Sequence, residues 1–315
     1  MKYKLNKRQI ETAVKRGSHA LFEYCRNNHI HFLIVGISGG LDSAVMLGFA
    51  DRARQLARKN NFLLVPVGLI MPCESTFESV KLAEEVISAF KSERYFCDLT
   101  NEYRAIKIMM DDNSLNHGIW EILYKYNKEI PPHENAINEW DWSTKIANGN
   151  IKARLRMITN YHVARMMKGM VLSTDNLSEF WMAFWTICGD IGDFGVIQNI
   201  LKGLELYDIA KYLGVPEGVL MAKPDDGLGI SGGDEDQLGA SYTVLDEIMI
   251  NLIQKGFDID GSLNQLNSLP DIGHDKSQVK KIAERCLTGS YKRKGTVVLS
   301  RKYLGLPEID EISLT

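Results

Sequence analysis

Short apolar runs alternate with amphipathic stretches over the N-terminal third of the chain. A continuously apolar run predicts a strand that is buried on both faces, whereas apolar residues that recur near a helical period predict a helix. The predicted strands are residues 31–35, 62–70 and 94–99, and the predicted helices are residues 10–28, 44–59 and 78–90. This alternation predicts right-handed β-α-β units, and therefore an α/β fold with a doubly wound parallel sheet and flanking helices.

The pattern is interrupted in the middle of the chain and then resumes. Residues 111–148 are rich in polar residues, prolines and tryptophans, and we predict an inserted excursion there. Beyond it, the pattern predicts a helix at residues 150–167, a strand at 170–173 and a helix at 204–213. The chain is therefore expected to form a single domain over residues 1–315, into which the excursion is inserted.

The composition is that of an ordinary globular protein, with 45% apolar and 24% charged residues. A net charge of -3 gives no indication of a nucleic-acid partner. The polar segment Met1–Arg8 does not resemble a secretory signal, and the longest apolar run, Phe62–Cys73, is shorter than the ~20 residues that span a bilayer. The five cysteines are scattered and never form a Cys-x-x-Cys pair, which predicts reduced thiols. We therefore expect a cytoplasmic protein with neither a membrane nor a nucleic-acid partner.

Eight residues join the predicted strand at 31–35 to the predicted helix at 44–59. They are Gly36, Ile37, Ser38, Gly39, Gly40, Leu41, Asp42 and Ser43. Glycines let the backbone approach an anion closely, and the helix start offers unpaired N–H groups and the positive end of the helix dipole. The two serines add hydroxyl donors, and Asp42 adds a carboxylate that suits Mg²⁺. A glycine-rich turn that merely caps a helix is the ordinary alternative, but the strand before it and the helix after it favour a phosphate site.

This loop is not of the Walker type, because the chain contains no Gly-x-x-x-x-Gly-Lys-Ser/Thr. It resembles the pyrophosphate loop of the ATP pyrophosphatase family, whose members transfer AMP to a substrate and release pyrophosphate. The resemblance implies cleavage of ATP between its α- and β-phosphates, and a Rossmann-like fold of the adenine nucleotide α-hydrolase kind. A second glycine-rich segment, Gly227–Gly232, matches the dinucleotide fingerprint, but no strand is predicted before it. We predict only a loop there.

Further segments resemble the ammonia-dependent NAD synthetases in order and spacing. These segments are Gly149–Met157, Ser173–Glu179, Gly189–Asp193, Lys202, Lys211–Glu217 and Asp234–Gly239. The resemblance implies a ligase that amidates nicotinate adenine dinucleotide (deamido-NAD) to NAD⁺ with ammonia. It also implies that the reaction proceeds through an adenylylated intermediate and releases AMP and pyrophosphate. The resemblance also implies a homodimer whose small-molecule substrates are ATP, deamido-NAD and ammonia.

The same resemblance assigns roles to individual residues. It implies that ATP is bound by the whole loop from Gly36 to Ser43 and by Thr174, Lys202 and Asp225, and that Mg²⁺ is bound by Asp42 and Glu179. It implies that deamido-NAD is bound by Tyr24, Asn150, Arg154, Phe184, Ile187, Asp190, Asp193 and Lys292. Asp190 and Lys202 are expected to be catalytic, with Asp190 near the incoming ammonia and Lys202 offsetting charge on the phosphates. For each of these residues taken alone, a surface charge or a core side chain is the ordinary interpretation.

Two arginines of the segment Gly149–Met157 are candidates for binding the substrate. Arg154 and Arg156 lie two positions apart on a predicted helix, so their side chains point in different directions. One of them can therefore reach a ligand while the other braces the structure. The resemblance selects Arg154 as the residue that binds substrate.

Three positions depart from the pattern of the family. Ile187 stands where the family has a substrate-binding lysine, Asp225 replaces a small hydroxyl residue at an ATP contact, and Tyr291 replaces the histidine before Lys292. These departures concern the binding of the dinucleotide more than the chemistry of ATP.

Two alternative functions stay open. A tRNA-modifying member of the same loop family would require paired cysteines and a basic surface, and the chain shows neither pattern. A catalytically silent nucleotide-binding subunit would explain the departures from the family pattern. The presence of Asp42, Glu179 and Lys202 argues against such a subunit.

Overall fold

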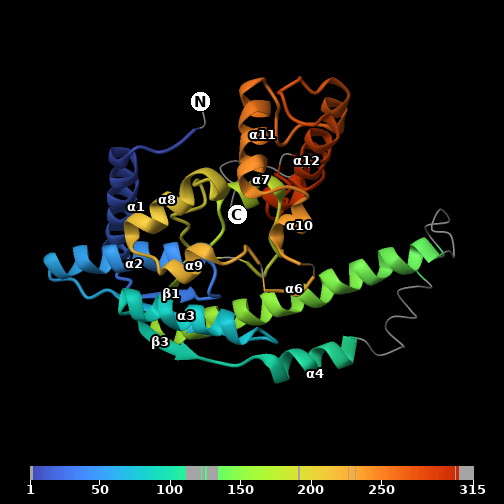
Figure 1. Ribbon diagram of the computed structural model, residues 1–315. Helices are drawn as coiled ribbons and strands as arrows, with labels where there is room; N and C mark the ends of the chain where they lie inside the picture. Colours follow the sequence, from blue (N-terminus) through green and yellow to red (C-terminus); the bar gives the residue numbers. More distant parts are fainter. Residues whose placement is uncertain are drawn as a thin grey trace, which may run out of the picture.

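Four parallel strands form the sheet of the computed structural model, which describes residues 3–110, 122, 125, 134–190, 192–225, 227–230, 232–301 and 303–304 (Figure 1). The strands are β1 (Phe32–Gly36), β2 (Val65–Ile70), β3 (Glu93–Phe96) and β4 (Met170–Val171). Within the described residues the strand order is β3-β2-β1-β4, and every pairing is parallel. The chain therefore builds the sheet outward through β2 and β3 and then returns to the other side of β1.

Strand β1 is buried on both faces of the sheet. Leu33, Ile34 and Val35 are all fully buried. Leu33 and Val35 belong to one hydrophobic core and Ile34 to another, because successive side chains of a strand point to opposite faces. This double burial explains why the strand is continuously apolar in the sequence.

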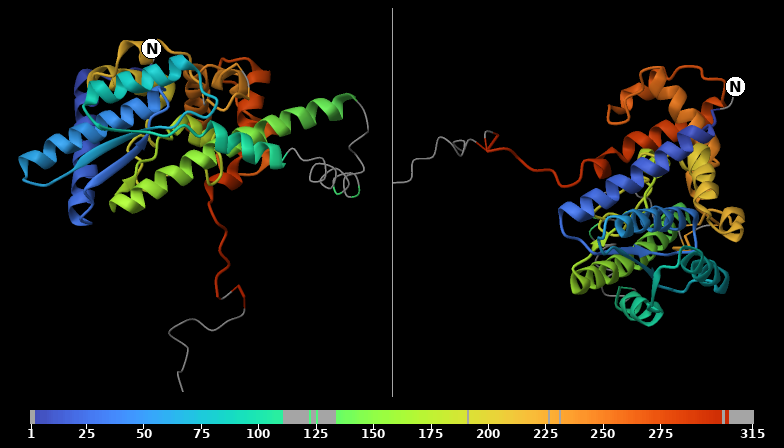
Figure 2. Two further views of the ribbon diagram at one scale, coloured as in Figure 1. Left: turned by 90° about the horizontal axis from the view of Figure 1, so that it is seen from below. Right: turned by 90° about the vertical axis from the view of Figure 1, so that its left-hand side faces the viewer.

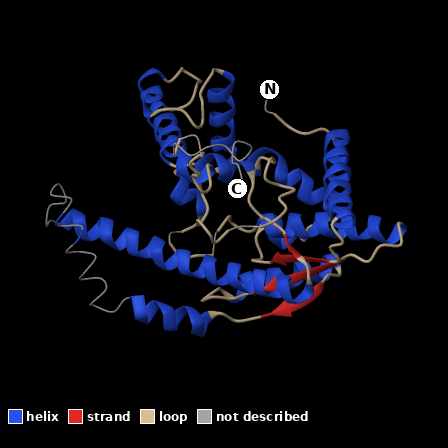
Figure 3. Ribbon diagram, turned by 180° about the vertical axis from the view of Figure 1, so that it is seen from behind, coloured by secondary structure: helices blue, strands red, loops and turns tan. Residues whose placement is uncertain are grey.

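A layer of helices covers each face of the sheet (Figures 1 and 3). One layer contains α1 (Lys7–Asn27), α2 (Leu41–Lys59), α3 (Phe77–Phe90) and α8 (Tyr207–Leu213), and the other contains α4 (Thr100–Met110) and α6 (Glu134–Met167). Leu21 and Phe22 of α1 pack in the first core with α2, whereas Tyr103 of α4 and Ala164 of α6 pack against the opposite face. The sheet is thus the middle layer of a three-layer α/β fold.

Apart from α9 (Glu217–Met221), which packs in the core of the sheet through Val219, the remaining helices form a unit beside the sheet, in which α11 and α12 stand away from it (Figure 2). This region contains α7 (Leu177–Met182), the π-helix η1 (Lys202–Leu206), α10 (Asp234–Leu238), α11 (Tyr242–Gln254), the 3₁₀ helix η2 (Leu263–Ser268), α12 (Lys276–Thr288) and α13 (Ser290–Arg293). Its separate core includes Leu252 and Ile282. Helix η1 joins the two parts, because Leu206 packs in the core of the sheet and Leu201, just before η1, packs in the helical core.

The predicted α/β fold with a doubly wound parallel sheet is confirmed. The predicted helix at 204–213 consists of two pieces, η1 and α8, and β4 is shorter than the strand predicted at 170–173. Helix α6 begins at Glu134, so residues 134–148 of the predicted excursion belong to a helix. The rest of that excursion lies outside the described residues, apart from Ile122 and Lys125. Along the described ranges, none of the helices has both the length and the apolar character that crossing a membrane requires.

The strand order places a topological switch point at the carboxyl ends of β1 and β4. These two strands are neighbours, but β1 is followed by β2 on its other side, whereas Leu172, just after β4, forms a parallel bridge with Phe194. Open α/β sheets bind their ligands in the crevice outside such a point. The loops after β1 and β4 are therefore the first place to look for a functional site.

Candidate active site

The phosphate loop (Gly36–Ser43) leaves the carboxyl end of β1 and enters α2. Its two serines fix the turn, since Ser38 Oγ lies 3.3 Å from Ser43 Oγ and accepts the Gly40 N–H at 3.2 Å. Ser43 Oγ also donates to the Gly40 carbonyl at 3.0 Å. The N-cap residue of α2 is Gly40, which makes no side-chain hydrogen bond. No capping side chain therefore competes for the N–H groups at this helix start, which suit phosphate oxygens.

Gly39 fits the loop because it lacks a side chain. Its φ is +88°, and a Cβ at this position would lie 2.3 Å from the backbone carbonyl oxygen of Ser79 on α3. Both the left-handed conformation and the close approach of α3 therefore require glycine. Helix α3 packs directly on the phosphate loop and determines its shape.

The turn after β4 brings a second set of polar residues to the loop. Asn176 is the N-cap of α7, and its Oδ1 accepts the backbone N–H of Glu179 at 3.0 Å. Its Nδ2 donates to Asp42 Oδ1 at 2.8 Å. This one buried amide therefore connects the start of α7 to the start of α2, and it aligns Asp42 with Glu179.

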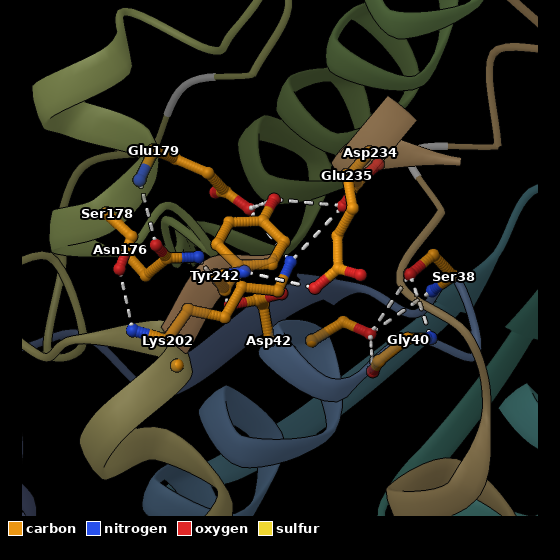
Figure 4. A network of polar contacts seen from close by, with 12 residues as sticks. Ser38, Gly40, Asp42, Asn176, Ser178, Glu179, Lys202, Asp234, Glu235 and Tyr242 are labelled. Carbon is orange, nitrogen blue, oxygen red and sulfur yellow. Dashed lines mark hydrogen bonds and ion pairs between the residues drawn. The ribbon is translucent and has the colours of Figure 1, made fainter. Parts of the chain in front are cut away.

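Lys202 Nζ lies among three carboxylates (Figure 4). It is 2.9 Å from Asp42 Oδ2, 3.0 Å from Glu179 Oε1 and 3.4 Å from Asp234 Oδ2. The ring of Tyr242 lies 4.3 Å from Nζ, and its hydroxyl is 3.0 Å from Asp234 Oδ2 and 3.2 Å from Glu179 Oε1. Lys202 is 4% exposed, so carboxylates rather than water balance its charge. It begins η1, a helix type that is frequent at functional sites.

Burial and charge both shift the protonation of this cluster. Burial alone would lower the pKa of Lys202, but the charges of Asp42 and Glu179 outweigh burial and raise that pKa well above its ordinary value. Burial raises the pKa of Glu179 to about 8 and also raises the pKa of Asp234, although the Lys202 charge opposes both shifts. Burial, together with the charge of a neighbouring carboxylate, raises the pKa of Asp175 to about 7. The raised pKa values show that these acids hold their protons more tightly than usual, and an additional cation at the cluster could take the place of those protons.

A cavity of about 480 Å³ opens beside the cluster. Its lining contains the entire phosphate loop from Gly36 to Ser43, together with Thr174, Glu179, Lys202 and Asp225. These are all of the residues that the sequence predicts to bind ATP or Mg²⁺. The volume lies within the range of small-molecule sites. The structure thus brings the predicted ATP residues together around one cavity.

Two of the residues predicted to bind deamido-NAD, Phe184 and Asp190, also line this cavity. Asp190 Oδ2 accepts the backbone N–H of Thr186 at 2.7 Å, and Thr186 Oγ1 donates to Asn150 Oδ1 at 2.7 Å. Asn150 therefore acts on Asp190 through Thr186. Burial raises the pKa of Asp190. The guanidinium of Arg285 lies 5.3 Å from the ring of Phe184, so the aromatic wall of the cavity is supported from behind by a cation.

Three other predicted dinucleotide residues lie outside the lining and have protein partners. The carboxylate of Asp193 accepts the hydroxyl of Tyr161 and the backbone N–H of Val171, each at 3.0 Å. Arg154 Nε donates to the carbonyl of Ile187 at 3.3 Å, and the Ile187 side chain is 43% exposed. In this structure Asp193 holds β4 through its hydrogen bond with Val171, and Arg154 holds the chain segment that precedes Asp190.

Tyr24 and Lys292 also lie outside the lining. Tyr24 is 42% exposed, and its ring centroid is 5.1 Å from that of Phe194. Lys292 Nζ donates to the carbonyls of Ala183 and Trp185, at 3.0 and 2.7 Å, where α7 ends. The predicted ligand roles of these two residues remain predictions.

Two cationic residues of α6 line the cavity, although the sequence analysis gave them no ligand role. They are Lys152 and Arg156, and Lys152 is only 7% exposed. Lys152 Nζ lies 3.8 Å from Glu74 Oε2, and Arg156 Nε donates to the carbonyl of Met71 at 3.3 Å. Their spacing of four residues places them on one face of the helix, and this signal was available in the sequence.

Three further members of the site were also missed. Asn176 and Glu179 match the N-cap and N3 positions of a helix start, so the sequence could have placed Glu179 in the first turn of α7. Asp234 follows the glycine-rich segment, but nothing local distinguishes it from a surface acid. Tyr242 has no sequence signal, because its role depends entirely on contact with Lys202.

A parallel α/β sheet with a non-Walker phosphate loop at its switch point defines a nucleotide-binding protein of the pyrophosphate-loop class. The carboxylate–lysine cluster next to the loop is consistent with this class. The family model described as NAD synthase matches residues 13–296. The chain belongs to the NAD synthase family, which confirms the resemblance found in the sequence.

Individual relatives agree with this assignment. The chain is 30% identical to the NH₃-dependent NAD⁺ synthetase of Pyrococcus horikoshii over 275 residues, which are 87% of this chain and 90% of the relative. It is 29% identical to the Pyrococcus furiosus protein of the same name over 267 residues, which are 84% and 88% of the two chains.

Solved structures show the same fold. The NH₃-dependent NAD synthetase of Campylobacter jejuni superposes with a TM-score of 0.63 at 20% identity and covers 92% of this chain and 99% of its own. The NMN synthetase of Francisella tularensis also gives a TM-score of 0.63, at 22% identity, with 92% and 98% covered. At these identities the two structures support the fold alone.

Proposed function

We propose that this chain is a ligase that converts deamido-NAD, ATP and ammonia to NAD⁺, AMP and pyrophosphate. A carboxylate oxygen of the nicotinate ring attacks the α-phosphorus of ATP, the bond to the β-phosphate breaks, and pyrophosphate leaves. Ammonia then adds to the activated carbonyl, loses a proton, and displaces AMP. The observation that carries this proposal is the meeting of the phosphate loop, Asp42, Glu179 and Lys202 at one cavity in a chain of this family.

Mg²⁺ is the metal that fits the residues at the cavity. Asp42 and Glu179 present carboxylate oxygens to the same point, because both contact Lys202 Nζ within 3.0 Å. In the part of the chain that the structure describes, no three His, Cys, Asp or Glu side chains form a complete metal cage. Mg²⁺ typically takes one or two carboxylates and completes its shell with phosphate oxygens and water. When bound, it would neutralise phosphate charge, and Asp42 and Glu179 are the residues that would hold it.

Catalysis by these residues consists of positioning and of charge neutralisation. The loop from Gly36 to Ser43 offers backbone N–H groups to the leaving pyrophosphate. Lys202 stays protonated because its pKa is raised, and its ammonium therefore offsets negative charge on the phosphates. The two substrates are held so that the carboxylate faces the α-phosphorus, and proximity of this kind lowers the barrier substantially.

Asp190 and Phe184 are the residues we assign to the nicotinate end of the site. Both line the cavity that contains the phosphate loop. Phe184 offers an apolar face for the ring, and Asp190 offers a carboxylate at which an incoming ammonium or ammonia can bind. Thr186 and Asn150 orient Asp190 through hydrogen bonds.

The alternatives considered from the sequence are less well supported. A tRNA-modifying enzyme was expected to carry paired cysteines, whereas the five cysteines of this chain are scattered and never form a Cys-x-x-Cys pair. A silent nucleotide-binding subunit has no need to gather three carboxylates and a lysine at the phosphate loop, yet this chain does so.

A product assay tests the proposal. Purified protein is incubated with ATP, Mg²⁺, ammonium and deamido-NAD, and NAD⁺, AMP and pyrophosphate are quantified. The proposal predicts one of each per turnover, with no AMP formed when deamido-NAD is omitted. Formation of ADP and phosphate instead, or NAD⁺ formation that Asp42→Asn leaves unchanged, would contradict it.

We also propose that the protein is a cytoplasmic homodimer that uses the face of α4 as its interface. The successive residues Ile108, Met109 and Met110 at the end of α4 are 74%, 59% and 39% exposed. Apolar side chains gathered in this way suit burial against a second copy of the chain. Light scattering of the wild type is expected to give the mass of a dimer, and Ile108→Glu is expected to shift it to the monomer. A monomeric wild type would refute the proposed interface.

A further inference from the structure

We infer that Asp234 is a positioning residue that provides the Lys202 ammonium with a second binding place when a metal ion takes Asp42 and Glu179. The inference rests on the proposed function, in which those two carboxylates bind Mg²⁺. Neither the resemblance nor the phosphate loop assigns any role to Asp234. The argument comes from the contacts around Lys202.

Lys202 and a metal ion compete for the same oxygens. Lys202 Nζ is 2.9 Å from Asp42 Oδ2 and 3.0 Å from Glu179 Oε1. A Mg²⁺ ion binds carboxylate oxygens at ~2.1 Å, so it cannot take both groups while the ammonium stays between them. Two positive charges at such a separation also repel each other strongly in a buried site. Lys202 must therefore move when the metal binds.

Asp234 is placed to receive the displaced ammonium. Its Oδ2 already lies 3.4 Å from Lys202 Nζ, and Asp234 is 3% exposed. Its Oδ1 is buried without a hydrogen-bond partner in the described part of the chain. A buried acceptor without a partner is costly, and an ammonium carries three donors. A movement of Lys202 towards Asp234 would therefore satisfy an oxygen that is unpaired at present.

Tyr242 guides this movement. Its ring lies 4.3 Å from Lys202 Nζ, so it forms a wall along which an ammonium is stabilised by the aromatic face. Its hydroxyl lies 3.2 Å from Glu179 Oε1 and 3.0 Å from Asp234 Oδ2, so it bridges the carboxylate that is given up and the carboxylate that receives. The amine can thus pass from one to the other without leaving the site.

The position of Asp234 keeps the displaced lysine near the phosphates. Asp234 begins α10 and lines the same cavity as the phosphate loop. Its backbone N–H donates to the carbonyl of Pro224, which also lines the cavity, at 3.2 Å. Lys202 therefore remains beside the bound nucleotide after it has released Asp42 and Glu179, and the metal and the ammonium can act on the phosphates together.

Binding of Mn²⁺ to the protein, measured by the loss of the free-ion EPR signal, tests the inference through a double-mutant cycle. Asp234→Asn removes the second binding place, so Lys202 stays on the metal carboxylates and Mn²⁺ binds about tenfold more weakly than to the wild type. Lys202→Met removes the competitor and tightens Mn²⁺ binding. In the Lys202→Met background, Asp234→Asn is expected to cost less than about threefold, because only its charge is then lost.

The inference stands or falls on whether the effect of Asp234→Asn on Mn²⁺ affinity depends on the presence of Lys202. An equal loss with and without Lys202 would overturn the inference, because Asp234 would then act as a direct metal ligand or through the fold. No loss in either background would overturn it as well. If Asp234→Asn does not fold, Tyr242→Phe is used instead and is expected to weaken Mn²⁺ binding only when Lys202 is present. A loss of Mn²⁺ affinity that does not depend on Lys202 would also overturn the inference. Failure of the proposed function is a separate result, seen as absent NAD⁺ synthesis by the wild type.

Discussion

The side-chain amide of Asn176 donates to the carboxylate of Asp42 over 2.8 Å, although 134 residues separate them in the chain. The same side chain accepts the N–H of Glu179 and begins α7. One residue therefore sets both the start of a helix and the distance between two carboxylates. This arrangement explains how residues from distant parts of the chain are brought to one place in the site.

Asn176→Ser separates these two functions. Serine also caps helices well, so α7 is expected to keep its start, but its short hydroxyl cannot replace the amide that contacts Asp42. We expect kcat/KM for ATP to fall about tenfold, the size of a lost hydrogen bond to a charged group, with little change in Tm. Asn6→Ser at the N-cap of α1 is the matched control, because it makes the same change far from the cavity. Equal effects of the two variants on kcat/KM would contradict the assigned role.

The two neighbouring glycines of the phosphate loop are expected to respond differently to alanine. Gly39→Ala forces a left-handed residue to carry a Cβ 2.3 Å from the carbonyl of Ser79, and we expect a loss of about 2 kcal/mol or more in the free energy of unfolding. Gly40 has φ of -87°, and its nearest atom would be the Ser38 side chain at 3.2 Å. Gly40→Ala should cost about 1 kcal/mol, the usual cost of alanine at an N-cap. Denaturant titration measures the free energy of unfolding of both variants. A larger loss for Gly40→Ala than for Gly39→Ala would contradict the loop conformation described here.

Arg156 and Arg154 offer a matched pair for the two substrates. Arg156 lines the cavity and donates to Met71 and Ser75, whereas Arg154 contacts the carbonyl of Ile187 outside the lining. We expect Arg156→Met to raise the KM for ATP about tenfold or more, through lost charge and a loosened cavity wall. Arg154→Met should raise the KM for deamido-NAD and leave that for ATP nearly unchanged. Steady-state kinetics with each substrate varied in turn measures both KM values. An increase in the KM for ATP caused by Arg154→Met, with Arg156→Met affecting only the KM for deamido-NAD, would contradict these roles.

Stability should depend on pH through Asp246, which is fully buried. Burial raises its pKa to about 7, although hydrogen bonds from Ser178 and from the Gly203 backbone oppose the shift. The pKa of an unfolded aspartate is about 3.9, so the folded chain binds this proton more tightly. The resulting stability is present below about pH 4 and is lost as the pH rises through about 7.

The variant Asp246→Asn isolates this contribution. It is expected to reduce the slope of the free energy of unfolding against pH by up to about 1.4 kcal/mol per pH unit between pH 5 and 7. Urea titrations of the wild type and the variant at several pH values measure the two slopes. Parallel slopes would show that Asp246 titrates alike in the folded and unfolded chains.

The sequence predicted best those parts of the site that local pattern determines. The unit of β1, the phosphate loop and α2 is continuous in the chain, and the double burial of Leu33, Ile34 and Val35 is visible as an apolar run. The carboxylate of Glu179 came from resemblance, since its partner Asp42 is distant. Its place in the first turn of α7 was nonetheless available from the N-cap pattern that Asn176 begins.

The remaining members could not be derived from the sequence, for physical reasons. A lysine or an aspartate is usually exposed, and the burial of Lys202 depends on carboxylates that α2, α7 and α10 contribute separately. The choice between Arg154 and Arg156 depends on the rotation of α6 about its axis. Contacts such as that of Ala164 with the far face of the sheet set this rotation, and they appear only in the folded chain.

The most direct test of the proposed reaction follows one oxygen atom. Deamido-NAD labelled with ¹⁸O in its carboxylate is turned over with ATP, Mg²⁺ and ammonium, and the products are analysed by mass spectrometry. Attack of the carboxylate on the α-phosphorus, followed by displacement of AMP by ammonia, predicts that one ¹⁸O atom passes from each deamido-NAD to AMP. Label found in pyrophosphate or phosphate, or NAD⁺ formed with unlabelled AMP, would contradict it.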